Sequence, residues 1–167
     1  MKKRLYFDTS AIIKEFVNEV GSELIDKVTT SAREGHLQVV SSVWSINEAL
    51  AVIDRKYKKN EITQVQIQTV ISTFAKRMID SSQKSNFFFA PLDHTILVNS
   101  REAIKDFHIS PSDALHLYTG WVYDCACFLV QDRNFVKQIP MKQYKDVKII
   151  DLAFEADRKY LETEIFI

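Results

Sequence analysis

Short apolar runs alternate along the chain with longer segments of helical period, and this alternation is the feature that most restricts its fold. The runs are rich in β-branched or aromatic side chains and lie at residues 4–8, 37–41, 87–90, 127–131 and 147–150. Such runs are typical of strands that are buried on both faces. Strands that alternate with helices build a parallel sheet with helices on either side. The sequence therefore predicts a three-layer α/β/α fold with a central parallel sheet of about five strands.

The segments between these runs carry helix signals. Apolar side chains recur at the spacing of one helical face over residues 43–57 and again over residues 62–78. A further helix is predicted to begin at Ser110, because a hydroxyl cap is followed by Pro111 at the first helical position and by the acid Asp113 in the first turn. These helices supply the outer layers of the predicted fold.

Composition predicts a single soluble unit. The chain has 167 residues, of which 46% are hydrophobic and 26% are charged, and a chain of this kind can bury a core of its own. With only three Gly and three Pro, no linker is apparent, so residues 1–167 are predicted to form a single domain. No apolar stretch approaches the roughly 20 residues that span a bilayer, and the N-terminal apolar run is soon interrupted by charges. We therefore expect no membrane association and a cytoplasmic location.

The two cysteines, Cys125 and Cys127, are one residue apart in a segment that is predicted to be a strand. Their side chains are therefore expected to point to the same face of the sheet. No further Cys or His nearby would complete a metal site. We expect two reduced thiols in or near the core, which suits a reducing cytosol.

Charge restricts how the chain could bind nucleic acid. Lys plus Arg and Asp plus Glu both total 22, so the formal net charge is zero and no global field attracts a polyanion. Binding would have to be local. The most basic run, Arg-Lys-Tyr-Lys-Lys at residues 55–59, could contact phosphates and stack on a base, or it could be a solvated helix end.

Four acids fall where predicted strands end and predicted helices begin. Asp8 ends the first strand, Asp132 follows the fourth, Asp113 lies in a first helical turn and Glu48 lies about one turn inside another helix. In open α/β sheets, function collects at this edge. Each acid also has a structural alternative: Asp8 could cap a helix, Asp113 could complete a capping pattern with Ser110, Glu48 could form a capping box with Ser45, and Asp132 could be a turn residue.

Converging carboxylates favour a cation among them. Two unit charges about 4 Å apart repel by about 4 kcal/mol at an effective dielectric constant near 20, and a divalent ion offsets that cost. Ligation by oxygen alone favours Mg²⁺ or Mn²⁺ over Zn²⁺. Such a site is suited to the hydrolysis of phosphodiesters, because the cation activates a water and stabilises the charged leaving oxygen.

Four segments carry a family resemblance. They are Tyr6-Phe7-Asp8-Thr9-Ser10-Ala11-Ile12-Ile13-Lys14, Asn47-Glu48-Ala49, Ser112-Asp113-Ala114-Leu115-His116-Leu117 and Asp132-Arg133-Asn134-Phe135. Together they resemble the PIN-domain ribonucleases and, within them, the VapC-like toxins of toxin-antitoxin pairs. The resemblance spans nearly the whole chain and implies a PIN-like domain that hydrolyses RNA with Mg²⁺ or Mn²⁺. It places the catalytic and metal-binding quartet at Asp8, Glu48, Asp113 and Asp132.

The resemblance also implies supporting residues. The family's hydroxyl beside the first acid falls on Thr9 or Ser10, which would orient a water or a carboxylate. The family often carries Ser or Thr two residues before its last acid, whereas this chain has Val130, so a hydrogen bond is expected to be missing there. Asn134 is a candidate neutral ligand in its place.

Partners follow from the same resemblance. VapC-like proteins dimerise and are restrained by an antitoxin that docks near the site. A homodimer and an antitoxin partner are therefore expected beside the RNA substrate, with the helices around residues 43–78 as the docking surface. The apolar faces of these helices could equally be plain core.

Two residues near the acids admit two interpretations each. His116 lies three residues after Asp113 and so on the same helical face, where it could be a general base or a buried histidine that is hydrogen-bonded to backbone. Lys14 lies one turn past Ser10 and could contact a phosphate or serve only in packing.

Two other functions compete with the nuclease. Phosphoaspartyl phosphohydrolases also begin with a strand that ends in Asp, but they need a second Asp two residues later, where this chain has Ser10. The other alternative is a non-catalytic module that binds RNA or protein and retains the PIN fold. The complete acidic quartet argues against it, because a chain without catalysis has no chemical reason to keep four acids together.

Overall fold

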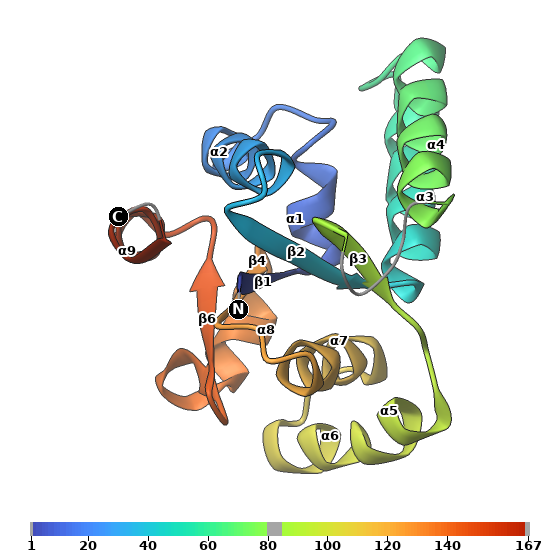
Figure 1. The fold of residues 1–167 in the computed structure, drawn as a ribbon. Coiled ribbons are helices and arrows are strands. Elements are labelled where there is room, and N and C mark those ends of the chain that lie inside the picture. Colours follow the sequence, from blue (N-terminus) through green and yellow to red (C-terminus); the bar gives the residue numbers. More distant parts are fainter. Residues whose placement is uncertain (1, 80–84, 166–167) are drawn as a thin grey trace.

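The structure is a computed structural model and describes residues 2–79 and 85–165. Six strands form a sheet in the order β3-β2-β1-β4-β6-β5, with helices on both faces (Figure 1). The strands are β1 (Lys3–Phe7), β2 (Leu37–Ser42), β3 (Phe87–Ala90), β4 (Cys127–Val130), β5 (Gln143–Tyr144) and β6 (Val147–Asp151). All pairs are parallel except β5 with β6. The predicted α/β/α fold and its five strands are confirmed, while the edge strand β5 is too short to leave a periodic signal.

Nine helices occur in the described residues, more than the sequence signals indicated. They are α1 (Thr9–Ile13), α2 (Ser22–Arg33), α3 (Trp44–Lys58), α4 (Gln64–Ile79), α5 (His94–Asn99), α6 (Arg101–Phe107), α7 (Pro111–Val122), α8 (Arg133–Gln138) and α9 (Glu155–Ile165). Within the described segments, every helix is too short or too polar to traverse a lipid bilayer.

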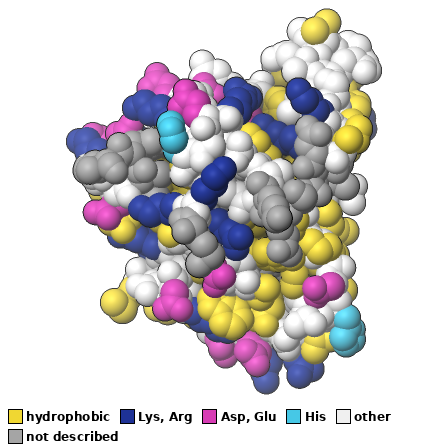
Figure 2. Space-filling view, viewed as in Figure 1, with side chains coloured by type: hydrophobic (Ala, Val, Ile, Leu, Met, Phe, Trp, Pro, Cys, Tyr) yellow, Lys and Arg dark blue, Asp and Glu magenta, His cyan; other side chains and the backbone are white. Residues whose placement is uncertain are grey.

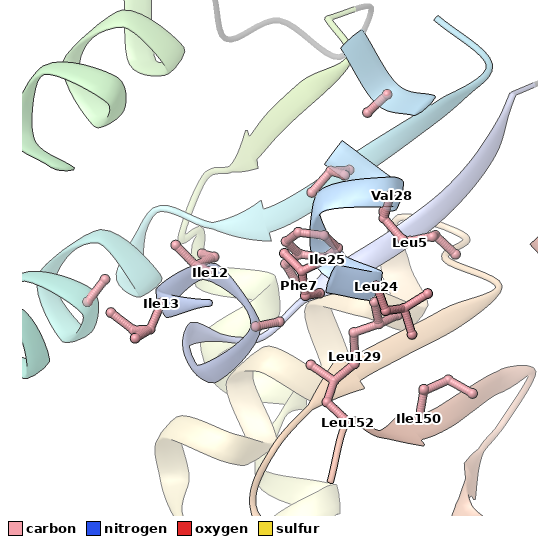
Figure 3. Packing of buried hydrophobic residues seen from close by; sticks show 14 of the residues in the cluster. Leu5, Phe7, Ile12, Ile13, Leu24, Ile25, Val28, Leu129, Ile150 and Leu152 are labelled. Atoms are coloured by element: carbon pink, nitrogen blue, oxygen red, sulfur yellow. The ribbon is translucent and has the colours of Figure 1, made fainter. Parts of the chain in front are cut away.

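Strand alternation divides the core into two layers. Leu5 and Phe7 of β1 point to one face, where they pack with Ile12 of α1, Ile25 of α2 and Leu129 of β4 (Figure 3). Helices α3, α4 and α9 also contribute to this layer. Because each buried aliphatic or aromatic side chain contributes roughly 1.5–3 kcal/mol, this layer holds α1 firmly against the strand ends.

The opposite face is covered by α6, α7 and α8. Tyr6 of β1 points to this side and stacks on Phe128 of β4, with ring centroids 5.0 Å apart. Leu117 of α7 and Phe135 of α8 complete the packing around this pair. Helices α7 and α8 are thereby fixed on the layer opposite to α1 and α3.

The two cysteines do not share a face, so that prediction is wrong. Both thiols are buried and unpaired, but Cys127 packs in the layer of α1 and α2, whereas Cys125 packs in the layer of α7. The reason is that β4 begins only at Cys127, so strand alternation does not extend back to Cys125. Burial raises the pKa of the Cys127 thiol to about 11, as expected of core residues.

The carboxyl ends of the central strands form the edge where the predicted site lies. The backbone N–H of Asp8 donates to the carbonyl of Leu129 at 3.1 Å, so β1 and β4 end side by side. Helices α1 and α8 start directly after them, and α3 starts directly after β2. On the face shown in Figure 2, side chains of both charges are mixed, in keeping with the zero net charge.

Candidate active site

A cavity of about 710 Å³ lies at this edge of the sheet. Its wall includes all four predicted acids, Asp8, Glu48, Asp113 and Asp132, together with the predicted supporting residues Thr9, Ser10, Lys14 and His116. Folding therefore brings to one hollow side chains that are up to 124 positions apart in the sequence, from Asp8 to Asp132. Asn134, the remaining predicted residue, is not on the wall.

Asp8 and Asp132 both act as helix caps, each through one carboxylate oxygen. Oδ2 of Asp8 accepts hydrogen bonds from the backbone N–H and the hydroxyl of Ser10, at 3.1 and 2.9 Å. Oδ1 of Asp132 accepts from the N–H groups of Asn134 and Phe135, at 2.8 and 3.0 Å. Asn134 thus contributes its backbone to the cap of α8, not a side chain to the cavity. The expected capping role of Asp8 is confirmed.

Asp113 completes the N-terminal motif of α7. Its Oδ2 accepts from the Ser110 hydroxyl at 2.7 Å, and its N–H donates back to the same hydroxyl at 3.1 Å. The other oxygens, Oδ1 of Asp8, Oδ1 of Asp113 and Oδ2 of Asp132, accept no hydrogen bond from the described residues. Each aspartate therefore combines a structural role with one uncommitted oxygen.

Electrostatics show that the three aspartates interact. Burial raises the pKa of Asp113, and the negative charges of Asp8 and Asp132 raise it further, while the hydrogen bond from Ser110 opposes the rise. Neighbouring like charges disfavour the ionised form. A cation among these carboxylates would relieve that repulsion.

Glu48 differs from the aspartates because both of its oxygens are committed. Oε2 accepts from the Thr9 hydroxyl and from Nε2 of His116, the latter at 2.8 Å, and Oε1 accepts from the Ser112 hydroxyl and from Nε1 of Trp44, the latter at 3.2 Å. Burial favours a higher pKa for Glu48, but these donors and the charge of His116 lower it to about 2. Glu48 therefore remains ionised and joins α1, α3 and α7.

The capping-box interpretation of Glu48 is wrong. Helix α3 begins at Trp44 after a Val43 cap that makes no side-chain hydrogen bond. Ser45 is fully buried, and its hydroxyl pairs with the Ser41 hydroxyl at 2.8 Å. Glu48 thus makes no capping box with Ser45, and its side chain lines the cavity.

His116 lies beneath Glu48 and is buried. Its Nδ1 lies 2.8 Å from the hydroxyl of Tyr6, which is also buried, and its Nε2 bonds Glu48. Burial favours a lower pKa for His116, but the hydrogen bond to Glu48 and the charges of Asp8 and Asp113 raise it. The expected burial is confirmed, although the partners are side chains and not backbone. Because both nitrogens are occupied, the geometry does not favour a general base.

Three cations line another part of the cavity wall. Lys14 is only 2% exposed, and its Nζ lies 3.4 Å from Oε2 of Glu19. Lys56 contacts the other oxygen of Glu19 at 2.9 Å. Arg55 is exposed, and its guanidinium makes no ion pair or hydrogen bond with the part of the chain that is described. Two members of the basic run at residues 55–59 thus border the cavity.

Sequence reasoning missed Gln131, which lines the cavity beside Asp132. Its backbone N–H donates to the Ser10 hydroxyl at 2.8 Å, and its side-chain Oε1 is buried without a hydrogen-bond partner. Buried acceptors are rarely left unpaired. Its place at the end of β4 was a usable signal, whereas nothing in the sequence pointed to the contact of Ser112 with Glu48.

The donor set fits a hydrated divalent cation better than a closed metal cage. Among residues 2–79 and 85–165, no three His, Cys, Asp or Glu side chains are grouped closely enough to hold a metal ion as they stand. Mg²⁺, however, usually keeps several waters and binds through one or two carboxylates. The uncommitted oxygens of Asp8, Asp113 and Asp132 and the unpaired Oε1 of Gln131 are ligands of the hard type that it prefers.

The fold is shared with solved structures. Neither a protein-family model nor a curated protein matches the sequence. A toxin-antitoxin complex from Klebsiella pneumoniae aligns with a TM-score of 0.55 and 16% identity, over 86% of this chain and 94% of that one. The protein PAE2754 from Pyrobaculum aerophilum aligns with a TM-score of 0.56 and 13% identity, over 98% of this chain and 100% of that one. At these identities the similarity establishes the fold.

Proposed function

We propose that the chain is a Mg²⁺- or Mn²⁺-dependent endoribonuclease of the PIN type and the toxin of a toxin-antitoxin pair. The observation that carries this proposal is that Asp8, Asp113 and Asp132 each present an uncommitted carboxylate oxygen on the wall of one cavity. Three such oxygens have no structural function, because the opposite oxygen of each carboxylate already makes the cap or the pairing.

In the proposed hydrolysis, the cation and the chain have different roles. A bound divalent cation supplies an activated water and offsets charge on the reacting phosphate. The chain holds the ligands in place: the Ser10 hydroxyl ties Asp8 to the N–H of Gln131 at the end of β4, and the Glu48 network keeps α3 against α7. Because neighbouring groups already fix each carboxylate, little side-chain conformational entropy is lost when the cation binds.

A polyanionic substrate suits the other part of the wall. Lys14, Arg55 and Lys56 supply local positive charge in a chain whose net charge is zero. Arg55 has no partner in the described residues, so it can contact a phosphate without first breaking an ion pair. Contacts of this kind provide most of the affinity of proteins for a nucleic-acid backbone.

The toxin role rests on the fold and on an apolar groove. The similarity to a toxin-antitoxin complex supports it. A groove of about 400 Å³ also lies between α3 and α4, which lie side by side (Figure 1), and Val43, Leu50 and Ile71 are among its lining residues. It falls within the segment expected to dock an antitoxin. A homodimer is proposed on the resemblance alone.

One observation favours a non-catalytic module instead. Asp8 and Asp132 cap helices, Asp113 pairs with Ser110, and Glu48 joins three helices. All four acids therefore have structural reasons to be present in a chain that does not cut RNA. In that case the protein binds RNA or a protein partner and hydrolyses nothing.

Cleavage of single-stranded RNA with Mg²⁺ or Mn²⁺ and with EDTA tests the proposal. Asp8→Asn and Asp113→Asn are the test variants, since Asn at position 8 still caps a helix. Glu162→Gln is the matched control because it removes an exposed carboxylate that pairs with Lys27. We expect activity that requires metal, survives in the control and falls by about 100-fold or more in the two variants.

Two other outcomes contradict the proposal. Cleavage that survives EDTA and both aspartate substitutions would show that the carboxylates do not act through a metal. Binding of RNA without cleavage by the unaltered protein, with either cation, would instead identify the non-catalytic module.

A further inference from the structure

Trp44 is not on the wall of the acidic cavity, but its indole N–H contacts two wall residues, Glu48 and Ser112, so it borders the rim of the cavity. It is the first residue of α3, and its indole N–H lies 3.2 Å from Oε1 of Glu48 and 3.2 Å from the Ser112 hydroxyl. These contacts join it to the network that holds α3 against α7. The plane of the ring is therefore restrained next to the candidate active site.

The ring itself has an unused surface. Trp44 is 40% exposed, although tryptophan is highly buried on average. No aromatic or cationic side chain among the described residues packs on its ring. A large, oriented and partly exposed aromatic surface therefore lies beside the Glu48 carboxylate.

Position along α3 relates this ring to the other features of the cavity. Trp44, Glu48 and Arg55 follow one another along the helix, and the eleven residues from Trp44 to Arg55 correspond to about 17 Å. Glu48 and Arg55 both line the cavity. Helix α3 thus presents an aromatic ring, then the site acid Glu48, then Arg55, whose guanidinium has no partner among the described residues.

We infer that Trp44 is a stacking platform for a nucleobase of single-stranded RNA, next to the phosphate that enters the cavity. This inference rests on the proposed ribonuclease function and adds a base-binding position to it. Unpaired RNA bases are commonly bound by stacking on aromatic side chains, and each such stack contributes about 1–3 kcal/mol. A base on Trp44 brings its own phosphate toward the carboxylates, where the cleavage is proposed to occur.

A protein partner is the less suitable occupant. The apolar groove between α3 and α4 is lined by Val43, Ile46 and Leu50, and Trp44 is not part of it. Apolar protein side chains seated on Trp44 would also cover the ionised Glu48 beside it, and burying an ionised group without a new partner is costly. A nucleotide, in contrast, presents polar groups to this rim.

The test measures RNA binding without cleavage. The chain has two tryptophans, so Trp121→Phe leaves Trp44 as the only indole, and Asp113→Asn in the same protein prevents turnover. The probe is a short oligouridylate with a fluorescent end label. Its dissociation constant is measured by anisotropy, and quenching of the Trp44 emission is measured with unlabelled RNA.

Trp44→Ala is expected to weaken oligouridylate binding by about 5- to 150-fold, the range that corresponds to 1–3 kcal/mol. Trp44→Phe is expected to restore most of the affinity, because it keeps a ring while losing the indole N–H. Phe154→Ala is the matched control: it removes a 53% exposed aromatic that does not line the cavity and is expected to change affinity less than about twofold. An abasic oligomer of equal length should bind equally to the Trp44→Ala variant and to the protein that retains Trp44.

The outcomes separate this inference from the proposed function. If the protein cleaves and binds RNA but Trp44→Ala binds oligouridylate normally, or if Trp44→Phe is as weak as Trp44→Ala, the stacking inference is overturned and the nuclease stands. If the unaltered protein neither binds nor cleaves RNA, the proposed function is overturned and this inference with it.

Discussion

Two glutamates, Glu15 and Glu48, occupy very different regions of the fold. Glu15 lies outside the cavity, with a side chain 5% exposed, and receives two hydrogen bonds from the Arg77 guanidinium at 2.6 and 2.8 Å and one from Thr29 at 2.9 Å. Glu48 lies on the cavity wall and is surrounded by hydroxyls, an indole and His116. The first is balanced by a permanent cation, the second by His116, whose charge depends on pH, together with the hydroxyl and indole donors.

The surroundings of Glu15 are suited to stability, whereas those of Glu48 are suited to function. An ion pair such as Glu15 with Arg77 satisfies its charges internally and leaves nothing for a ligand. The network around Glu48 joins α1, α3 and α7 and borders three aspartates that each retain an uncommitted oxygen. We therefore expect changes at Glu15 to affect folding and changes at Glu48 to affect chemistry.

The largest effect on stability is expected from Arg77→Ala. This change leaves the buried Glu15 carboxylate without its cation, and breaking a buried pair in this way costs about 3–5 kcal/mol of unfolding free energy. Urea unfolding measures it. Arg33→Ala, which removes an exposed arginine on α2, is the control, and cleavage per folded molecule should stay within about twofold in both. A loss below about 1 kcal/mol would show that the ion pair is not structural.

Glu48→Gln should affect cleavage more than stability, the opposite of Arg77→Ala. Its carboxamide keeps the shape but loses the charge and two acceptor positions, so cleavage is expected to fall by about 10- to 100-fold. The unfolding free energy should fall by only about 1–3 kcal/mol. Glu15→Gln is the matched change, expected to lose stability without losing turnover. Equal losses of turnover in the two variants would remove the distinction between the two regions.

The pair of Glu48 and His116 should make the free energy of unfolding depend on pH. The pKa of His116 is raised on folding. Its contribution to the free energy of unfolding is therefore complete below about pH 6.5 and is lost as the pH rises through the folded pKa. The pKa of Glu48 is lowered to about 2, so its contribution is present above about pH 4.5 and is lost as the pH falls. The stability difference between wild type and His116→Gln, measured by urea unfolding in EDTA, should be largest between about pH 4.5 and about pH 6.5. A difference that grows above pH 8 would contradict this assignment.

The smallest effect is expected from Ser112→Ala, which removes one of four donors to Glu48. A single hydrogen bond to a charged group contributes about 1.5–3 kcal/mol when it is fully buried, and Glu48 is partly exposed, so we expect about 1 kcal/mol and a loss of turnover below about tenfold. Ser72→Ala on the exposed face of α4 is the control. A loss as large as that of Glu48→Gln would mean that Ser112 itself contacts the substrate.

The sequence predicted the elements with strong periodicity. The central strands, the helices α3, α4 and α7 and the position of Asp8 at the end of β1 followed from local patterns of apolar side chains and caps. The convergence of the four acids on one cavity was also predictable, because the carboxyl ends of parallel strands meet at one edge. The short helices α5, α6 and α8 were not, since six or seven residues carry too little periodicity.

Contacts between residues that are far apart in the sequence could not be predicted from local sequence patterns. Ser112 and Glu48 are 64 positions apart, and Tyr6 and His116 are 110 apart, and no spacing rule links them. Glu48 was therefore predicted as one of four equivalent ligands, whereas its two oxygens are occupied by donors. Gln131 was overlooked because an amide beside an acid has no motif of its own, although its Oε1 is buried without a hydrogen-bond partner among the described residues.

The most direct test of the central claim is Mn²⁺ binding measured by isothermal titration calorimetry, without RNA. We expect the unaltered protein and Glu15→Gln to bind Mn²⁺ with the same affinity, and Asp113→Asn and Asp132→Asn each to weaken this affinity by about tenfold or more. Equal binding by all four proteins, or no binding by any of them, would contradict the claim that the uncommitted oxygens of these aspartates form a cation site.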